Sequence, residues 1–483
     1  MARPGPGRGA GARTSEGMLL IPALAVPAFA VALAGLQLDG AVPAALPLFA
    51  GVLGGGALAL HLLLRRIAPR ADPALLPVAV ALNGIGLAAI GGLDGAWDGE
   101  ARRQLAWTAL GAAACAAVLL LVRDPRRLQR YPYLQAAAGL ALLLLPVLPV
   151  VGVELYGARR WVAVGGYTVQ PSEFAKVVLI VFLAAYLSFK GEALAVAGRQ
   201  LRVRGVKVFS LPRMRDLGPM TIAWGFAILV LVATKDLGTS LLLFAVFLAM
   251  LYAATRRKSW VGIGLLMFSA GAAAAWAIFW HVQSRVEIWL NAFDPEVYRA
   301  ESGGSHQLVQ GLFALAEGGL AGTGFDGARS AGIFAADSDL ILVSIGEVYG
   351  LTGLAAVLLL LLLLVERGFR AALDARERFA SLLACGMAFL FAFQVFVVLG
   401  GVTRLIPLTG MTTPFLSAGG SSLIAGWVVA GLWLRISDAA HRPPPQPAGD
   451  EPTEMIPLRP ERRGGGSRRE GRPGQSRSAE RDQ

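Results

Sequence analysis

Apolar stretches alternate with short polar stretches along most of the chain. A helix needs about 20 mainly apolar residues to cross the hydrocarbon core of a bilayer, and twelve stretches approach that length. They lie near residues 18–36, 43–64, 73–92, 104–122, 133–151, 170–188, 217–234, 238–254, 259–280, 339–364, 379–399 and 413–434. The pattern predicts an all-α, polytopic membrane helix bundle with about twelve transmembrane helices.

The segments outside these stretches suggest the domain organisation. We expect a basic N-terminal tail over residues 1–17, a multi-pass membrane domain over 18–435 and a C-terminal tail over 436–483. The C-terminal tail is rich in Pro, Gly, Arg and Ser and almost free of aromatic residues, which predicts disorder. Residues 281–338 form the longest loop, and loops of this length are usually functional.

Composition and charge support a membrane location. The chain is 55% hydrophobic and 16% charged, whereas about a quarter of the residues of a soluble domain are charged. The net charge of +12 is concentrated in alternate connections between spans, as the positive-inside rule requires. We therefore predict that both termini are cytoplasmic, and that the basic excess reflects topology and no nucleic-acid partner. Cys115 and Cys385 fall inside predicted spans, so no thiolate metal site is expected.

One predicted span carries two ionisable side chains. Glu173 and Lys176 lie three residues apart, on one face of a helix that begins near Pro171. Charged groups in a bilayer are costly and often mark a pathway or site. A mutually neutralising pair that only fixes helix packing is the alternative. Arg159 and Arg160 precede this span, and arginine forks suit phosphate oxygens.

Further polar residues gather toward the predicted outer face. Asp236 follows one span and is either a helix N-cap or a site residue. Arg404 precedes a segment interrupted by Pro and Gly, whose free backbone groups need protein or a water-filled cavity around them. The other candidates there are Asp339, Ser421 and Ser422. Together they predict a hydrophilic site that opens outward.

The long loop supplies a candidate general base. A carboxylate at Asp294, beside a lipid-facing cavity, could accept a proton, although an Asp-Pro pair often only starts a turn. His306 is a second candidate. The G-x-G-x-x-G match at 322–327 lacks a preceding strand, and the chain contains no Walker A, H-E-x-x-H or G-x-S-x-G motif.

Several segments, in this order, resemble the SEDS family of shape, elongation, division and sporulation proteins, and within it the RodA-like proteins of actinobacteria. These segments are GARRWVAVGGYTVQPSEFAK, TKDLGTSLLL, HQLVQGLFALAEGGLAGTGF, SDLILVSIGEVYGLTG and RLIPLTGMTTPFLSAGGSSL. The resemblance covers about residues 150–436. It implies a ten-helix core with two extra N-terminal helices.

The resemblance implies a peptidoglycan glycosyltransferase of RodA/FtsW type. Such an enzyme polymerises lipid II into glycan strands at the outer face of the cytoplasmic membrane, for cell elongation or division and cell shape, with undecaprenyl pyrophosphate as leaving group. The family's essential Asp corresponds to Asp294, which would deprotonate the acceptor hydroxyl. Cations would hold the pyrophosphate, and the candidates are Arg159, Arg160, Lys176 and Arg404.

The resemblance also implies partners and leaves alternatives. A class B penicillin-binding protein and other proteins of the elongation or division complex are expected partners. No metal ligands are predicted, but a divalent cation such as Mg2+ or Mn2+ stays open as a cofactor. A lipid II flippase and a non-catalytic scaffold that activates a penicillin-binding protein are the alternative functions. His306, Val348 and Ala418 depart from the family pattern around the site.

Overall fold

The computed structural model describes residues 8–442 apart from 96, 150, 156, 197–198, 204–205, 212–221, 223–224, 231, 233 and 301–303. The long helices are α1 (Arg8–Asp39), α2 (Leu46–Ile67), α3 (Leu75–Asp94), α4 (Glu100–Leu121), α5 (Pro132–Leu144), α6 (Pro171–Val196), α8 (Leu237–Thr255), α9 (Lys258–Ile278), α14 (Gly350–Asp374), α15 (Arg378–Val402) and α16 (Gly420–Ala440). The shorter helices are η1 (Pro125–Arg130), η2 (Leu145–Val147), α10 (Trp280–Leu290), α11 (Pro295–Arg299), α12 (His306–Glu317), η3 (Arg329–Gly332) and α13 (Ile341–Val348).

The predicted polytopic helical bundle is confirmed. Within the described residues, ten helices are long and apolar enough to cross a membrane, and the predicted span 133–151 appears as a shorter apolar helix. The predicted span 217–234 lies largely outside the described residues, as do the tail residues 1–7 and 443–483. The helix α1 already begins at Arg8, within the segment expected to be a tail, and α16 continues to Ala440.

One predicted span is placed differently. The stretch 339–364 divides into α13 and α14, and the membrane-length helix runs over Gly350–Asp374. Gly350 has φ +70°, a conformation that favours glycine. A Cβ atom at Gly350 would also lie 2.4 Å from the carbonyl oxygen of Leu320. The break therefore comes from a close backbone approach that hydropathy alone does not reveal.

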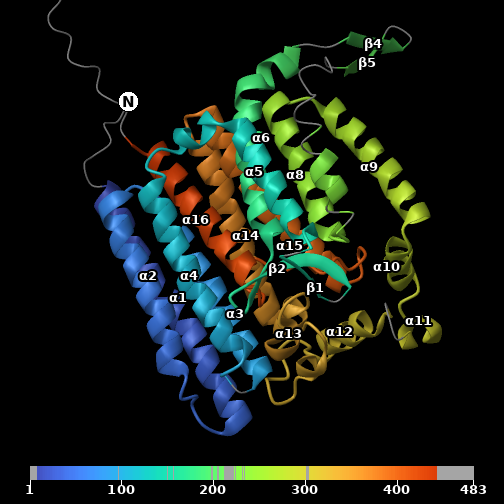
Figure 1. Cartoon of the computed structure of the whole chain (residues 1–483). Coiled ribbons are helices and arrows are strands. Elements are labelled where there is room, and N and C mark those ends of the chain that lie inside the picture. Colours follow the sequence, from blue (N-terminus) through green and yellow to red (C-terminus); the bar gives the residue numbers. More distant parts are fainter. Residues whose placement is uncertain are drawn as a thin grey trace, which may run out of the picture. The chain divides into compact units, whose positions relative to one another are not determined.

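The bundle has a buried centre and an exposed edge. In the most apolar stretch of α3, 94% of the residues are buried, and α3 packs against α1, α4, α14 and α16. A helix that is apolar all round belongs in such a core. In the corresponding stretch of α9, 0% of the residues are buried, and α9 runs into α10 along one edge of the bundle (Figure 1). The edge is apolar enough to face lipid.

The structure also contains strands that the sequence patterns did not predict. β1 (Gly152–Leu155), β2 (Ala158–Val164) and β3 (Tyr167–Val169) form an antiparallel sheet in the order β1-β2-β3. Gly165 and Gly166 join β2 to β3 and both have positive φ, as a two-residue hairpin turn requires. β4 (Arg199–Val203) and β5 (Val206–Leu211) form a separate hairpin.

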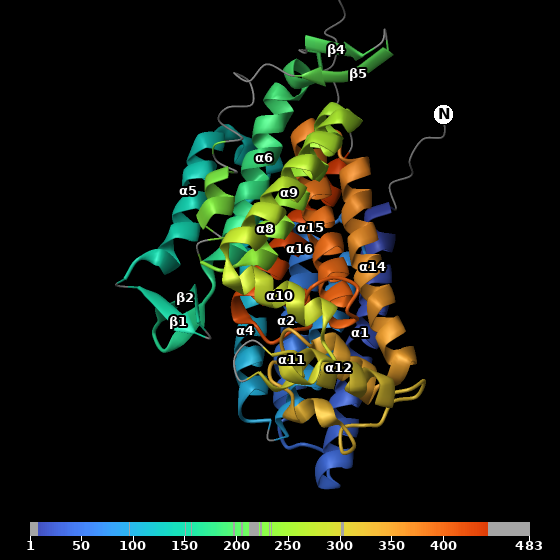
Figure 2. The same ribbon diagram turned by 90° about the vertical axis from the view of Figure 1, so that its right-hand side faces the viewer.

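The two ends of the bundle differ in what they carry. We call the end with β1–β3 and α10–α13 the loop end; both views place it opposite to β4 and β5 (Figures 1 and 2). The other end, where the start of α1 lies near the end of α16, is called the terminal end. The predicted loop 281–338 thus folds into α10, α11, α12 and η3 at the loop end.

Candidate functional site

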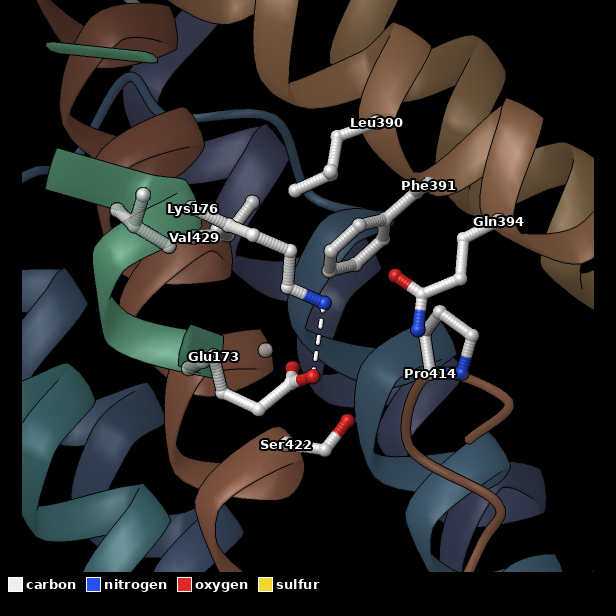
Figure 3. A pocket seen from close by; sticks show the side chains of 11 residues that line it. Glu173, Lys176, Leu390, Phe391, Gln394, Pro414, Ser422 and Val429 are labelled. Carbon is white, nitrogen blue, oxygen red and sulfur yellow. Dashed lines mark hydrogen bonds and ion pairs between the residues drawn. The ribbon is translucent and has the colours of Figure 1, made fainter. Parts of the chain in front are cut away.

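The pair Glu173 and Lys176 lies in a small buried pocket. The two residues occupy the first turns of α6, where Pro171 starts the helix as predicted. Lys176 Nζ lies 2.8 Å from Glu173 Oε1, and both side chains are buried. The pocket offers only about 10 Å³ to the centre of a water-sized molecule and is also lined by Gln394, Pro414 and Ser422 (Figure 3). The ammonium is therefore already paired with a carboxylate.

The predicted serines connect the start of α16 to its neighbours. The N–H of Gln170 donates to Ser421 Oγ at 2.8 Å, which joins the start of α6 to α16. Thr412 Oγ1 donates to Ser422 Oγ at 2.9 Å. Ser422 lines the pocket and Ser421 does not. Residues 403–419 form no helix, in line with the predicted interruption by Pro and Gly, but the predicted span 413–434 therefore begins only at Gly420.

The two adjacent arginines of β2 have different surroundings. Arg159 is half exposed and its Nε lies 3.3 Å from Glu154 Oε2. The Arg160 side chain is only 16% exposed, and its guanidinium carbon lies 5.2 Å from the ring centroid of Trp161. Its Nη1 is 3.9 Å from Asp236 Oδ1, and its buried Nε has no hydrogen-bond partner among the described residues. Arg160 is therefore a buried cation whose donors are largely unused.

Asp236 has the N-cap role that the sequence allowed, and it also lies beside Arg160. Its Oδ1 accepts a hydrogen bond of 3.3 Å from the N–H of Thr239, so it is the N-cap of α8. Its Oδ2 lies 3.5 Å from Ser172 Oγ, and the same carboxylate faces Arg160. The cap holds this acid in place beside the guanidinium.

Asp339 and Arg285 complete a mixed charge cluster at the loop end. Burial raises the pKa of Asp339, whereas Arg160 and Arg285 act against that rise. Arg285, on α10, donates from Nη1 to the carbonyl oxygen of Leu408 at 2.7 Å. Burial and Arg160 lower the pKa of Arg285, while Asp236 and Asp339 raise it. Arg285 was not among the predicted site residues, because only the fold brings it within electrostatic reach of Arg160.

Arg404 lies at the C-terminal end of α10. Its Nε and Nη2 donate to the carbonyl oxygens of Trp289 and Leu290, at 2.8 and 2.6 Å. Its guanidinium carbon is 5.4 Å from the ring centroid of Phe293. A cation there satisfies the last carbonyls of the helix and favours its dipole. Arg404 thus holds α10 against the loop between α15 and α16.

Asp294 is exposed and lies apart from the residues that line the pocket. It is the N-cap of α11, with Oδ1 accepting a hydrogen bond of 2.9 Å from the N–H of Glu296. The loop is fixed to the start of α12, because Ser305 Oγ donates to the carbonyl oxygen of Ala292 at 2.5 Å. The Tyr298 and His306 rings lie 5.1 Å apart in the same region.

The glycine-rich run 318–324 packs backbone to backbone against residues 346–350. A Cβ at Gly318 would lie 2.2 Å from the carbonyl oxygen of Gly346. The buried carboxylate of Glu347 accepts from the N–H groups of Arg329 and Ser330, at 2.8 and 2.9 Å. The glycines of the G-x-G-x-x-G match thus allow close backbone packing against residues 346–350.

The other departures from the family pattern also have defined places. Val348 is buried, and the backbone N–H of Ala418 donates to the carbonyl oxygen of Asp337 at 2.8 Å. Among the described residues, no group of three or more His, Cys, Asp or Glu side chains is arranged to hold a metal ion.

Comparison with protein families gives a match over most of the chain. The FtsW/RodA/SpoVE family of cell cycle proteins matches residues 92–442. The peptidoglycan glycosyltransferase RodA of Mycobacterium bovis is 44% identical over 393 residues, which cover 79% of this chain and 81% of that protein. The stage V sporulation protein E of Bacillus subtilis is 31% identical over 340 residues, which cover 70% of this chain and 86% of that protein.

Solved structures share the fold. A chain from a peptidoglycan synthase complex, solved to show how polymerization and crosslinking are coordinated, has a TM-score of 0.62 at 24% identity, and covers 77% of this chain and 99% of that chain. The rod shape determining protein RodA of Thermus thermophilus has a TM-score of 0.53 at 24% identity, over 77% of this chain and 98% of that chain. The likeness extends over nearly the whole of both solved chains.

Proposed function

Since the chain belongs to the FtsW/RodA/SpoVE family, we propose that it is a peptidoglycan glycosyltransferase that polymerises lipid II into glycan strands. Relatives that carry the name peptidoglycan glycosyltransferase are 44% identical to this chain over most of their length. The reaction takes place at the outer face of the cytoplasmic membrane, and the loop end faces outward with both termini in the cytoplasm. The distribution of Arg and Lys between connections supports this orientation.

The observation that carries the proposal is the buried guanidinium of Arg160. Glycosyl transfer from lipid II releases undecaprenyl pyrophosphate, so the site must stabilise negative charge on the departing diphosphate. Three of the predicted cations already have protein partners: Arg159, Lys176 and Arg404. Arg160 has its nearest carboxylate oxygen at 3.9 Å, on Asp236, and its Nε is unpaired among the described residues. Guanidinium groups suit phosphate oxygens because they donate in a fixed fork.

Asp294 is the proposed general base. It accepts the proton of the acceptor sugar hydroxyl as that oxygen bonds to the anomeric carbon of the donor, whose bond to the diphosphate oxygen breaks. The carboxylate is exposed and one Oδ accepts a backbone N–H, which leaves lone pairs for a substrate hydroxyl. Contacts between a base and its substrate often form only in the complex.

The proposed partners follow from the same reaction. A class B penicillin-binding protein would crosslink the strands that this chain polymerises, and further elongation or division proteins would join them. The solved chain with the TM-score of 0.62 comes from a complex that coordinates polymerization and crosslinking.

The proposal is tested with purified full-length protein, alone and with a class B penicillin-binding protein, and labelled lipid II. We expect glycan polymer from the wild type, and at least about 100-fold slower polymerisation from Asp294→Ala, the loss typical of a general base. Asp326→Ala, an exposed acid of the same end, is the matched control and should retain activity. Lipid II movement across vesicles without polymer would instead support the flippase, and activity only in the partner's transpeptidation would support the scaffold.

A further inference from the structure

Five exposed arginines at the terminal end form no hydrogen bond or ion pair within the part of the chain that the structure describes. We call them the arginine arc: Arg65, Arg66, Arg123, Arg127 and Arg130. The first two lie in the last turn of α2, the third follows α4, and the last two belong to η1. They carry five positive charges at the ends of neighbouring helices.

A buried side chain of α16 brings the ends of α2 and α4 together. Arg435 donates from Nη1 to the carbonyl oxygen of Ile67 at 2.9 Å, and from Nη2 to the carbonyl oxygen of Leu119. Ile67 is the last residue of α2, and Leu119 lies in the last turn of α4. The cations that follow these two carbonyls therefore lie at the same level of the bundle.

The connection that carries three of the five arginines is fixed to the bundle. Pro125 of η1 is buried, and Leu128 packs against the hydrophobic core. The Nε2 of Gln129 donates to Ser188 Oγ on α6 at 2.8 Å. Because these side chains point inward and are held there, η1 presents its arginines outward on a defined surface.

The acids nearest to η1 in the sequence and the fold are already committed. Asp124 is the N-cap of η1, and its Oδ1 accepts a hydrogen bond of 3.0 Å from the N–H of Arg126. Glu377 Oε1 lies 2.6 Å from Nη2 of the same Arg126, which is not part of the arc. The arginine arc thus keeps a surplus of positive charge, which attracts an anionic ligand.

The arginine arc borders on apolar side chains of membrane-facing helices. Leu121 ends α4, and Tyr133 and Leu134 lie in the first turn of α5; all three are exposed. α5 lies at the margin of the bundle (Figure 2). The guanidinium carbon of Arg130 is 5.2 Å from the ring centroid of Tyr131, which is also exposed. Tyrosines are enriched at the level of lipid headgroups.

We propose that the arginine arc binds the phosphate groups of anionic phospholipids, with acyl chains against Leu121 and Leu134. Guanidinium groups suit phosphate oxygens, and clusters of about four to eight basic residues beside a membrane helix bind anionic lipid. An acidic protein would need the charges alone, whereas a phospholipid uses the charges and the apolar border together.

The bound lipid would also join two parts of the chain. Arg65 and Arg66 precede the family match that begins at residue 92, whereas the other three arginines lie inside it. An anionic lipid that contacts both groups therefore holds the N-terminal helices to the family core. Glycosyl transfer plays no part in this inference, since no residue of the arc belongs to the site proposed for that reaction.

The test measures lipid binding by the full chain in a neutral detergent. Native mass spectrometry follows titrations with dioctanoyl phosphatidylglycerol and dioctanoyl phosphatidylcholine. We expect the wild type to bind phosphatidylglycerol at least about fivefold more tightly than phosphatidylcholine. The triple variant Arg123→Gln, Arg127→Gln, Arg130→Gln should bind phosphatidylglycerol about tenfold or more weakly than the wild type, because each cation near an anionic headgroup contributes to the affinity. Its binding of phosphatidylcholine should stay within about twofold.

A second triple variant is the matched control. Arg102→Gln, Arg299→Gln, Arg329→Gln removes the same charge from exposed positions of the loop end and should bind phosphatidylglycerol within about twofold of the wild type. Lysine at the three positions of the arc keeps the charge and should recover most of the affinity. Leu121→Ser with Leu134→Ser should weaken the binding of both lipids, because these side chains contact acyl chains and not the phosphate.

Three results would overturn the proposal. Equal losses in the two Gln triple variants would mean that net charge alone attracts the lipid. An unchanged affinity of the arc variant would leave the arc to an acidic protein. Displacement of phosphatidylglycerol by glycerol 3-phosphate at equal concentration would mean that the arc binds a soluble phosphate and no membrane lipid.

Thermal unfolding in nanodiscs gives a second readout. The wild type should unfold at a higher temperature in discs that contain phosphatidylglycerol than in discs of phosphatidylcholine, because a ligand that binds the folded state stabilises it. The arc variant should lose this difference, and the loop-end control should keep it. A difference that persists in the arc variant would contradict the role of the arc in holding the N-terminal helices.

Discussion

Buried charges at the two ends of the bundle are handled in opposite ways. At the terminal end, the buried carboxylate of Glu16 binds the guanidinium of Arg13 and lies 2.6 Å from His61 Nδ1. Arg13 also donates to the carbonyl oxygen of Ala71. At the loop end, Arg160, whose side chain is 16% exposed, has no carboxylate oxygen closer than 3.9 Å among the described residues. The buried arginines of the terminal end have close carboxylate or carbonyl partners, although the Nε atoms of Arg13 and Arg435 lack one among the described residues. Arg160 differs in having no carboxylate at hydrogen-bond distance.

The terminal end continues this internal pairing between helices. Asp438 on α16 accepts from the backbone N–H of Arg70 at 3.1 Å, and Asp72 accepts from Arg367 on α14 at 3.5 Å. Arg435 donates to the carbonyl oxygens of Ile67 and Leu119. Because α1 and α2 precede the family match at residue 92, this network attaches the N-terminal helices to the rest of the bundle. A matched buried charge therefore indicates architecture, and an unmatched one indicates binding.

The largest effect on stability should come from removing the buried carboxylate that pairs with Arg13 and His61 at the terminal end. Glu16→Ala leaves Arg13 and His61 buried without their carboxylate, which should destabilise the protein by about 3–5 kcal/mol. Thermal unfolding in detergent measures the loss. Glu16→Gln keeps the size and an acceptor and should lose less. Binding of farnesyl pyrophosphate, a probe for the proposed diphosphate site at Arg160, should stay unchanged in the folded Glu16→Ala protein. A weaker affinity of Glu16→Ala for farnesyl pyrophosphate would show that the two ends are coupled, and would contradict the view that they serve separate roles.

A smaller effect is expected for the pair in the pocket. Glu173→Gln or Lys176→Met alone leaves the other residue charged and buried, whereas the double variant removes both charges. We expect the double variant to be more stable than the sum of the single losses predicts, with a coupling energy of about 1–3 kcal/mol. The unfolding temperatures of the wild type, the two single variants and the double variant measure this double-mutant cycle. Additive losses would mean that Lys176, like Arg160, awaits a ligand and that the pair is not matched.

The sequence predicted the helices better than their interruptions. Apolar stretches of membrane length located the long helices, because helix length and hydropathy are local properties. Hydropathy over membrane-length stretches did not predict the short sheet at 152–169. A hairpin signal was nevertheless present, because Gly165 and Gly166 lie between β-branched and aromatic residues. The break at Gly350 depends on contact with the glycine-rich run 318–324, which no local pattern contains.

The candidate site was only partly visible in the sequence for the same reason. The start of α6 at Pro171 and the cap at Asp236 follow local rules, and both predictions are confirmed. The different surroundings of Arg159 and Arg160 follow from the alternation of side chains along β2, which was not predicted. The meeting of Arg285 with Arg160 depends on how α10 packs, and the roles of Asp294 and Arg404 in catalysis stay predictions.

The smallest expected effect concerns Asp339, the buried acid that interacts with Arg160 and Arg285. Burial raises its pKa above the ordinary carboxyl value, so its ionised form lowers the stability of the folded state. This cost is absent below the ordinary pKa, develops as the pH rises from the ordinary to the raised pKa, and is complete above the raised pKa. Asp339→Asn should therefore unfold a few degrees higher than the wild type at pH 7.5, and the difference should shrink as the pH falls toward about 4.

The same substitution should also strengthen diphosphate binding, since it removes a negative charge next to Arg160 and Arg285. We expect an affinity for farnesyl pyrophosphate about twofold to fivefold higher at pH 7.5, the size of a screened charge interaction near the surface. Asp326 is an exposed acid of the same end. Asp326→Asn should change neither the unfolding temperature nor the affinity for farnesyl pyrophosphate. A weaker affinity in Asp339→Asn would mean that this carboxylate orients the two guanidiniums, so that the loop end, like the terminal end, depends on its acids for structure.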